Sequence, residues 1–115
     1  MRPLKDMGES ASEPECTAIV RERVLRAREA ARARWAGTCW GTNAEVPGSV
    51  LRRRFRLPRE VTEPIAAALR RGMVTARGAD RTLRLAWTVA DLAGRDRPLV
   101  EDVSVAMGLR DRSAA

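Results

Sequence analysis

The stretch TARGADRTLRLAWTVADLAG, from Thr75 to Gly94, decides the fold of this chain because it combines a helix start, a helix end and a wide apolar surface. Thr75 predicts the N-cap, and Gly94 the end, of a helix over about 76–93. At about 100° per residue, apolar side chains cover most of this helix, which predicts a buried central helix. One narrow polar strip remains, and it contains Arg77, Arg81, Arg84, Thr88, Asp91 and Arg95.

The N-terminal half of this polar strip holds three arginines about one turn apart, Arg77, Arg81 and Arg84. Like charges at this spacing repel, and a cation in the first turn also faces the positive end of the helix dipole. One interpretation is a solvated or internally paired edge. The other is a phosphate contact, since guanidinium groups suit phosphate oxygens and Gly78 would let a ligand come close.

Helical periodicity on both sides of the central stretch predicts three further helices and a short closing helix over about 100–109. Trp40, in the loop before the second of them, is expected to pack back onto the domain. The expected caps and ends are Ser12 and Gly37 for the first helix, opening near Glu13, then Ser49 for the second, and Thr62 and Gly72 for the third. No run alternates as a strand, so the sequence predicts an all-α fold, a small bundle of four to five helices.

Composition limits the chain to one domain with a basic surface. It has 115 residues, 44% of them hydrophobic, and a net charge of +7. Such a surface indicates polyanionic partners, although solubility alone can also sustain it. We expect residues 1–12 to be a flexible lead or the remainder of an upstream domain, 13–112 to form the helical domain, and 113–115 to be a disordered tail.

The run LRRRFRLPRE is the second basic feature, and it contains Arg52, Arg53, Arg54, Arg56 and Arg59. As a solvated face it would be anchored by Leu51, Phe55 and Leu57. As a functional surface it would contact a DNA or RNA backbone without base specificity. The sequence leaves both interpretations open.

Several chemistries are not expected of this chain. It contains no histidine, so Ser-His and Cys-His catalysis and the usual metal sites cannot form, and we expect Cys16 and Cys39 to be reduced thiols. No apolar stretch is long enough for a membrane span and the start is no signal peptide, which predicts a cytoplasmic protein without a membrane partner.

Four motifs in order resemble the C-terminal domain of magnesium-chelatase-related AAA+ ATPases, specifically the branch with ComM and YifB. The central helix shows the pattern of Thr75, Arg77, Arg81, Leu83 and Arg84 followed by AWTVADLAG. The other three motifs are VRERVLRAREAARARW, TNAEVPGSVLRR and VEDVSVAMGLR. Together they cover roughly residues 17–112. Trp87 and Ala31 depart from the pattern, which usually has Arg and Gln there.

The resemblance implies a helical lid over a nucleotide that a P-loop domain holds. The sensor-2 arginine of such lids reaches the β/γ-phosphates, and by position it is Arg77, with Arg81 as the runner-up. The implied cofactor is ATP with Mg, and the implied partners are an AAA+ P-loop domain, upstream or in a separate chain, a ring of identical subunits and DNA. The family role is branch migration in the recombination of incoming DNA.

The chain lacks the motor that such a lid serves. A P-loop needs G-x-x-x-x-G-K-[ST], and the only lysine is Lys5, outside any such motif, so this chain alone is not expected to hydrolyse ATP. It resembles the lid of a truncated or split ATPase. The alternatives are a freestanding basic helical module that binds nucleic acid and a remnant without function.

Overall fold

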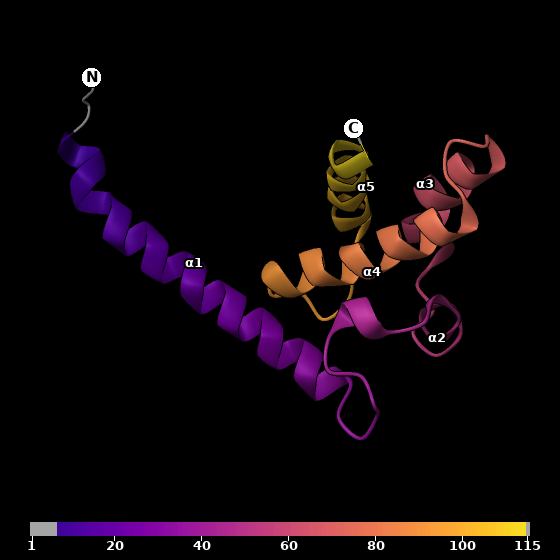
Figure 1. Cartoon of the computed structure of the whole chain (residues 1–115), viewed down its shortest axis with the longest axis horizontal. Helices are drawn as coiled ribbons and strands as arrows, with labels where there is room; N and C mark the ends of the chain where they lie inside the picture. The colour runs from indigo at the N-terminus through magenta and orange to yellow at the C-terminus, as the bar shows by residue number, and fades with distance from the viewer. Residues whose placement is uncertain (1–6, 115) are drawn as a thin grey trace.

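The fold is all-α, as predicted (Figure 1). The computed structural model describes the backbone of residues 7–114 and the side chains of residues 17–110. Of the expected lead over 1–12 and tail over 113–115, residues 1–6 and 115 lie outside the described residues, and the backbone of the others continues the first and last helices. The division into lead, domain and tail stays a prediction. The described elements are α1 (Met7–Arg34), the 3-10 turn η1 (Asn43–Glu45), α2 (Gly48–Arg53), α3 (Arg59–Arg70), α4 (Ala76–Leu92) and α5 (Val100–Ala114).

Helix α4 is the central element, and it contacts α1, η1, α2, α3 and α5. This agrees with its wide apolar surface, which buries Leu83, Ala86, Trp87 and Ala90. The N-terminal half of α1 extends away from the other helices (Figure 1). The α1 stripe is accordingly buried only near its C-terminal end, while Ile19 and Val20 are exposed.

The aromatic side chains form a connected row in the core. Phe55 packs edge-on between Trp35 and Trp87, with ring centroids 4.9 and 5.9 Å away. Trp40 packs edge-on against Trp35 at 5.9 Å, which confirms that the loop folds back onto the domain. Aromatic pairs in this geometry add stability beyond the apolar area that they bury. The row joins the end of α1, the segment after α2 and the middle of α4.

The boundaries of α4 were predicted correctly from its flanking residues. The Thr75 hydroxyl accepts a hydrogen bond from the backbone N–H of Gly78 at 3.0 Å, which is the expected cap. Gly94 has a φ of +78°, a left-handed conformation that favours glycine. Gly37 and Gly72, the other two predicted helix ends, also have positive φ.

Three predicted helix starts were wrong. Helix α1 begins at Met7, six residues before Glu13, because adding residues to an existing helix is easier than starting one. Helix α2 begins at Gly48 with Pro47 as its N-cap, so Ser49 is not the cap. Helix α3 begins at Arg59 after Pro58, and the Thr62 hydroxyl donates to the Arg59 carbonyl inside the first turn.

Packing explains the early starts of α2 and α3. Gly48 lies directly against the carboxylate of Asp80, where a Cβ would clash, so the backbone is already turned toward α4 at this position. In α3, Val61 is buried with Ile65 and Ala68, and these residues share one face only if the helix includes the residues before Thr62. The closing helix α5 also continues beyond the predicted Leu109, to Ala114.

Candidate functional site

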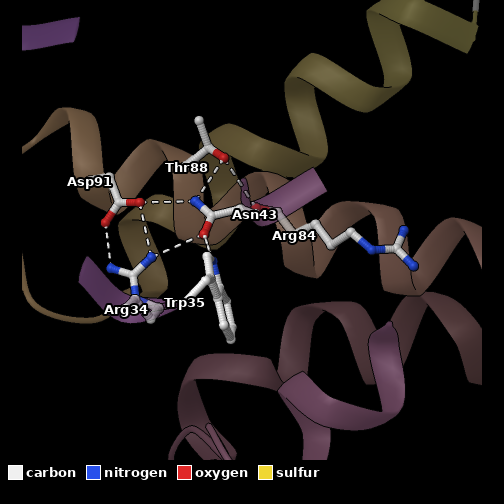
Figure 2. A network of polar contacts seen from close by, with 6 residues as sticks. All are labelled: Arg34, Trp35, Asn43, Arg84, Thr88 and Asp91. Carbon is white, nitrogen blue, oxygen red and sulfur yellow. Dashed lines mark hydrogen bonds and ion pairs between the residues drawn. The ribbon is translucent and has the colours of Figure 1, made fainter. Parts of the chain in front are cut away.

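A buried polar network joins the C-terminal half of the α4 strip to α1 and η1 (Figure 2). The Asp91 carboxylate accepts hydrogen bonds from the guanidinium group of Arg34 at 2.6 and 3.0 Å, and from the side-chain amide of Asn43 at 2.9 Å. Asn43 also donates to the Thr88 hydroxyl at 3.1 Å. Its side-chain oxygen accepts from Arg34 and from the indole of Trp35. Asn43 therefore uses both ends of its amide to connect three elements.

The loop before η1 holds Asn43 in place through a second set of hydrogen bonds. The Glu45 carboxylate accepts from the backbone N–H groups of Gly41 at 2.7 Å and Thr42 at 3.0 Å. These bonds stabilise the charged form and lower the pKa of Glu45 below its usual value. The turn between them presents Asn43 to α4.

The C-terminal end of the strip is thus internally paired, whereas the two interpretations of the sequence concerned the three arginines of its N-terminal half. Arg95, beyond the end of α4, forms ion pairs with Asp102 and Glu101 of α5. Asp102 is buried, and it also accepts a hydrogen bond from the backbone N–H of Leu99. These contacts hold the start of α5 against α4.

The N-terminal half of the strip borders a hollow of about 470 Å³. The Nε of Arg84 donates to the backbone carbonyl of Val46 at 2.6 Å, and its guanidinium end points away from the Asp91 network (Figure 2). This bond fixes the side chain and leaves the terminal amino groups available. The residues lining the hollow are Ala44, Gly78, Arg81, Arg84, Leu85, Thr88 and Arg110.

The structure therefore separates the three predicted phosphate-binding arginines. Arg81 and Arg84 line one hollow, whereas Arg77 is exposed in the first turn of α4 and does not line it. Within the described side chains, no acidic group pairs with Arg77 or Arg81. Arg110 of α5 is the additional basic residue of this hollow, and only the packing of α5 against α4 reveals it.

The five arginines predicted to bind nucleic acid do not form one uniform surface. Arg52 forms an ion pair with Asp80, while Arg56 and Arg59 border a second hollow with it. Arg53 and Arg54 are exposed and do not line that hollow. Binding of nucleic acid by this cluster stays a prediction.

Other features of the described residues concern membranes, metals and thiols. No described helix is long and apolar enough to cross a membrane. No group of three or more His, Cys, Asp or Glu among these residues could hold a metal ion. Cys39 is a free, exposed thiol, and the side chain of Cys16 lies outside the described ones.

Comparison with known protein families identifies one family model that matches most of the chain. The family model described as magnesium chelatase, subunit ChlI C-terminal, matches residues 14–110. The chain belongs to this family. The ChlI C-terminal match includes the Asn43 turn, the whole of α4 and the three arginines that line the first hollow, Arg81, Arg84 and Arg110. It therefore supports the resemblance at the level of the family, and the ComM and YifB branch is a finer assignment.

Similar proteins place this ChlI C-terminal domain within longer chains. Proteins described as uncharacterized from two strains of Mycobacterium tuberculosis and one of Mycobacterium bovis are 46% identical to it over 114 residues. The match covers 99% of this chain and 23% of each relative, so the chain spans about a quarter of their length. No solved structure gives a significant match.

Proposed function

We propose that the chain acts as the helical lid of an AAA+ ATPase and supplies arginines of α4 to nucleotide phosphates held by a P-loop domain. Membership of the ChlI C-terminal family supports the lid assignment. The relatives also have about three quarters of their length outside the match, which leaves room for a nucleotide-binding domain. The partner would be such a domain, in the same chain or a separate one.

The observation that carries the proposal is that Arg81 and Arg84 line one hollow beside the N-terminal half of α4. Phosphate oxygens suit these residues because guanidinium groups donate paired hydrogen bonds to them. Arg84 is held in advance by the Val46 carbonyl, so binding would cost little side-chain entropy. Within the proposal, Arg81 is the first candidate for the sensor-2 role and Arg77, predicted by position, is the second.

The chemistry of the proposed site is electrostatic. ATP with its magnesium ion would be bound mainly by the P-loop domain and would supply the phosphoryl group that is transferred to water. Arg81 would stabilise negative charge on the phosphate oxygens, and Arg84, which lines the same hollow, would help to orient them. The Asn43 network would hold the C-terminal half of α4 against α1 and η1 while the lid moves.

The finer parts of the proposal follow from the ComM and YifB resemblance. The complete protein would form a ring of identical subunits in the cytoplasm and promote branch migration during recombination of incoming DNA. The basic surface of the domain agrees with a DNA-associated role, because sequence-independent binding depends on arginine contacts to phosphates.

The test joins this chain to the P-loop domain of a magnesium chelatase family protein and measures ATP hydrolysis. We expect Arg81→Ala to lower kcat by about 10²-fold, as for loss of one donor to developing charge. Arg53→Ala, an exposed arginine outside the hollow, is the matched control and should leave the rate unchanged. Wild-type rates in Arg77→Ala, Arg81→Ala and Arg84→Ala alike would refute the proposal.

A further inference from the structure

A second hollow, of about 490 Å³, lies between α2, α3 and α4 and is not used by the proposed lid function. Its floor is apolar and includes Leu51, Leu57, Ile65 and Leu83. Small side chains leave the space open, since α3 contributes Ala66 and α4 contributes alanines on the facing side. The remaining lining residues are Arg52, Arg56, Arg59, Thr62, Leu69, Ala76, Ala79 and Asp80.

The rim of this second hollow, called the groove from here on, is positively charged because Arg52, Arg56 and Arg59 line it. Asp80 is the only acidic residue among the described residues that line it, and it is already paired with Arg52. Among the described residues, neither Arg56 nor Arg59 forms an ion pair or a side-chain hydrogen bond.

The pKa of Glu63, one turn beyond Arg59 on α3, is lowered by the hydrogen bond from Arg70 and also by the charge of Arg59. Neither Glu63 nor any other acid apart from Asp80 is among the described residues that line the groove. An apolar floor with these arginines at its edge fits an occupant with apolar groups on one side and negative charges beside them.

We propose that this groove docks an acidic amphipathic segment of a partner polypeptide. Amphipathic helices bind apolar grooves through side chains spaced three or four residues apart, and charge complementarity at the rim selects the partner. Exposed Leu69 at the end of α3 continues the apolar floor to the surface.

The apolar floor distinguishes this groove from a nucleic-acid surface. A nucleic-acid backbone would meet the guanidinium groups but would leave the floor of Leu51 and Ile65 without an apolar partner. It would also use Arg53 and Arg54, which are exposed outside the groove, as readily as Arg56 and Arg59. Arg53 with Arg54 and Arg56 with Arg59 carry the same charge but lie outside and inside the groove. Replacing one pair and then the other therefore distinguishes an acidic peptide from a nucleic acid.

The first experiment selects binders to the chain from a phage-displayed library of random peptides of about 16 residues. We expect the selected peptides to carry net negative charge and apolar residues at helical spacing. The most enriched peptide is then synthesised, and its Kd is measured by fluorescence anisotropy against the chain and its variants. Failure to enrich any such peptide, while the chain binds a duplex DNA oligonucleotide, would overturn the proposal.

Two variants test the shape of the groove and the charge of its rim separately. Ala66→Trp fills the groove without changing the charge, and the double substitution Arg56→Glu with Arg59→Glu reverses the rim without touching the core. Each should raise the peptide Kd at least about tenfold. The matched control, Arg53→Glu with Arg54→Glu, should change it by less than about twofold. Equal losses from the two charge reversals, or no effect of Ala66→Trp in a chain with wild-type helix content, would overturn the proposal.

Isoleucine labelling provides an internal control for the location. The chain has two isoleucines, Ile65 on the floor of the groove and Ile19 on the exposed part of α1. In a sample with ¹³C-labelled isoleucine methyl groups, the peptide should shift the Ile65 signal and leave the Ile19 signal in place. Shifts of Ile19 alone would place the peptide elsewhere and contradict the proposal. None of these measurements involves nucleotide, so their failure is distinct from failure of the lid function.

Discussion

The guanidinium group of Arg34 and the carboxylate of Asp91 form a doubly hydrogen-bonded ion pair across 57 positions of sequence. The Asp91 side chain is 1% exposed and the Arg34 side chain 11%, so water screens the pair only weakly. The Arg34 guanidinium also lies 4.6 Å from the ring centroid of Trp87, a cation–π contact. This pair is therefore the main polar connection between α1 and α4.

Breaking this pair from one side should be strongly destabilising. Arg34→Leu or Asp91→Leu would leave an uncompensated buried charge, so each should lower the free energy of unfolding by about 3–5 kcal/mol. The double variant should cost less than the sum, because it removes both charges together. Urea unfolding followed by circular dichroism measures all three. The exposed pair of Glu22 and Arg26 is the control, where Glu22→Ala should cost at most about 0.5 kcal/mol.

The two buried tryptophans should respond differently to replacement by phenylalanine. The indole Nε1 of Trp35 donates to Asn43 at 2.9 Å, whereas the buried Nε1 of Trp87 has no hydrogen-bond partner in the described part of the chain. Trp87→Phe removes an unsatisfied donor, so it should cost about 1 kcal/mol less than Trp35→Phe. Thermal unfolding of both variants gives the comparison, and a larger loss for Trp87→Phe would contradict it.

Two threonines test the helix caps. The Thr75 hydroxyl accepts from the Gly78 backbone, so Thr75→Ala should lower the free energy of unfolding by about 1 kcal/mol. Thr62 was predicted from sequence to be a cap but lies inside α3, and its hydroxyl donates to the Arg59 carbonyl instead. Thr62→Ala should therefore change stability by less than about 0.5 kcal/mol. Equal losses in urea unfolding would support the sequence-based cap at Thr62.

The carboxylate of Glu45 should make the Asn43 turn sensitive to acid. Because its pKa is lowered in the folded chain by hydrogen bonds from Gly41 and Thr42, its contribution to stability is complete above the ordinary value of 4.5. The contribution is lost as the pH falls through the lower, folded value. An NMR titration of the side-chain carboxyl carbon should give a midpoint below 4.5.

The matched variants for this titration are Glu45→Gln and Glu29→Gln. Glu45→Gln should remove the part of the acid-induced loss of stability that comes from this turn, so its unfolding free energy should depend less on pH between neutral and acidic solution. Glu29 is exposed on α1 and forms no hydrogen bond among the described residues, so Glu29→Gln serves as the control. Identical pH profiles for Glu45→Gln and the wild type would argue against the stabilising role of the Glu45 bonds.

The predictions from sequence succeeded where the determining interactions are local. Thr75 and Gly94 delimit α4 through bonds and dihedral angles within a few residues, and both were identified correctly. Ser49 and Thr62 failed as caps because distant contacts, Asp80 against Gly48 and the burial of Val61, set the helix starts earlier. Local preference is worth only about 1 kcal/mol at a cap, and packing can exceed it.

The candidate sites show the same division. Helical spacing predicted the polar strip on α4. It did not predict that one half of the strip would line a hollow while the other half would be paired with side chains of other helices. Arg110 enters the hollow only because α5 packs on α4, and Arg34 reaches Asp91 only because α1 ends beside η1. Similarly, the basic run gave no signal that Arg56 and Arg59 face a groove while Arg53 and Arg54 do not.

By itself, the amino-acid sequence determined that this protein is helical, that α4 is its central element and that arginines follow one side of that helix. These properties follow from spacing along a single helix, where each residue lies about 100° from the last. Only the tertiary structure decided which arginines have acidic partners and which border the two hollows. Ion pairs and hollows depend on the distances between side chains of different helices, and those distances arise when the helices pack.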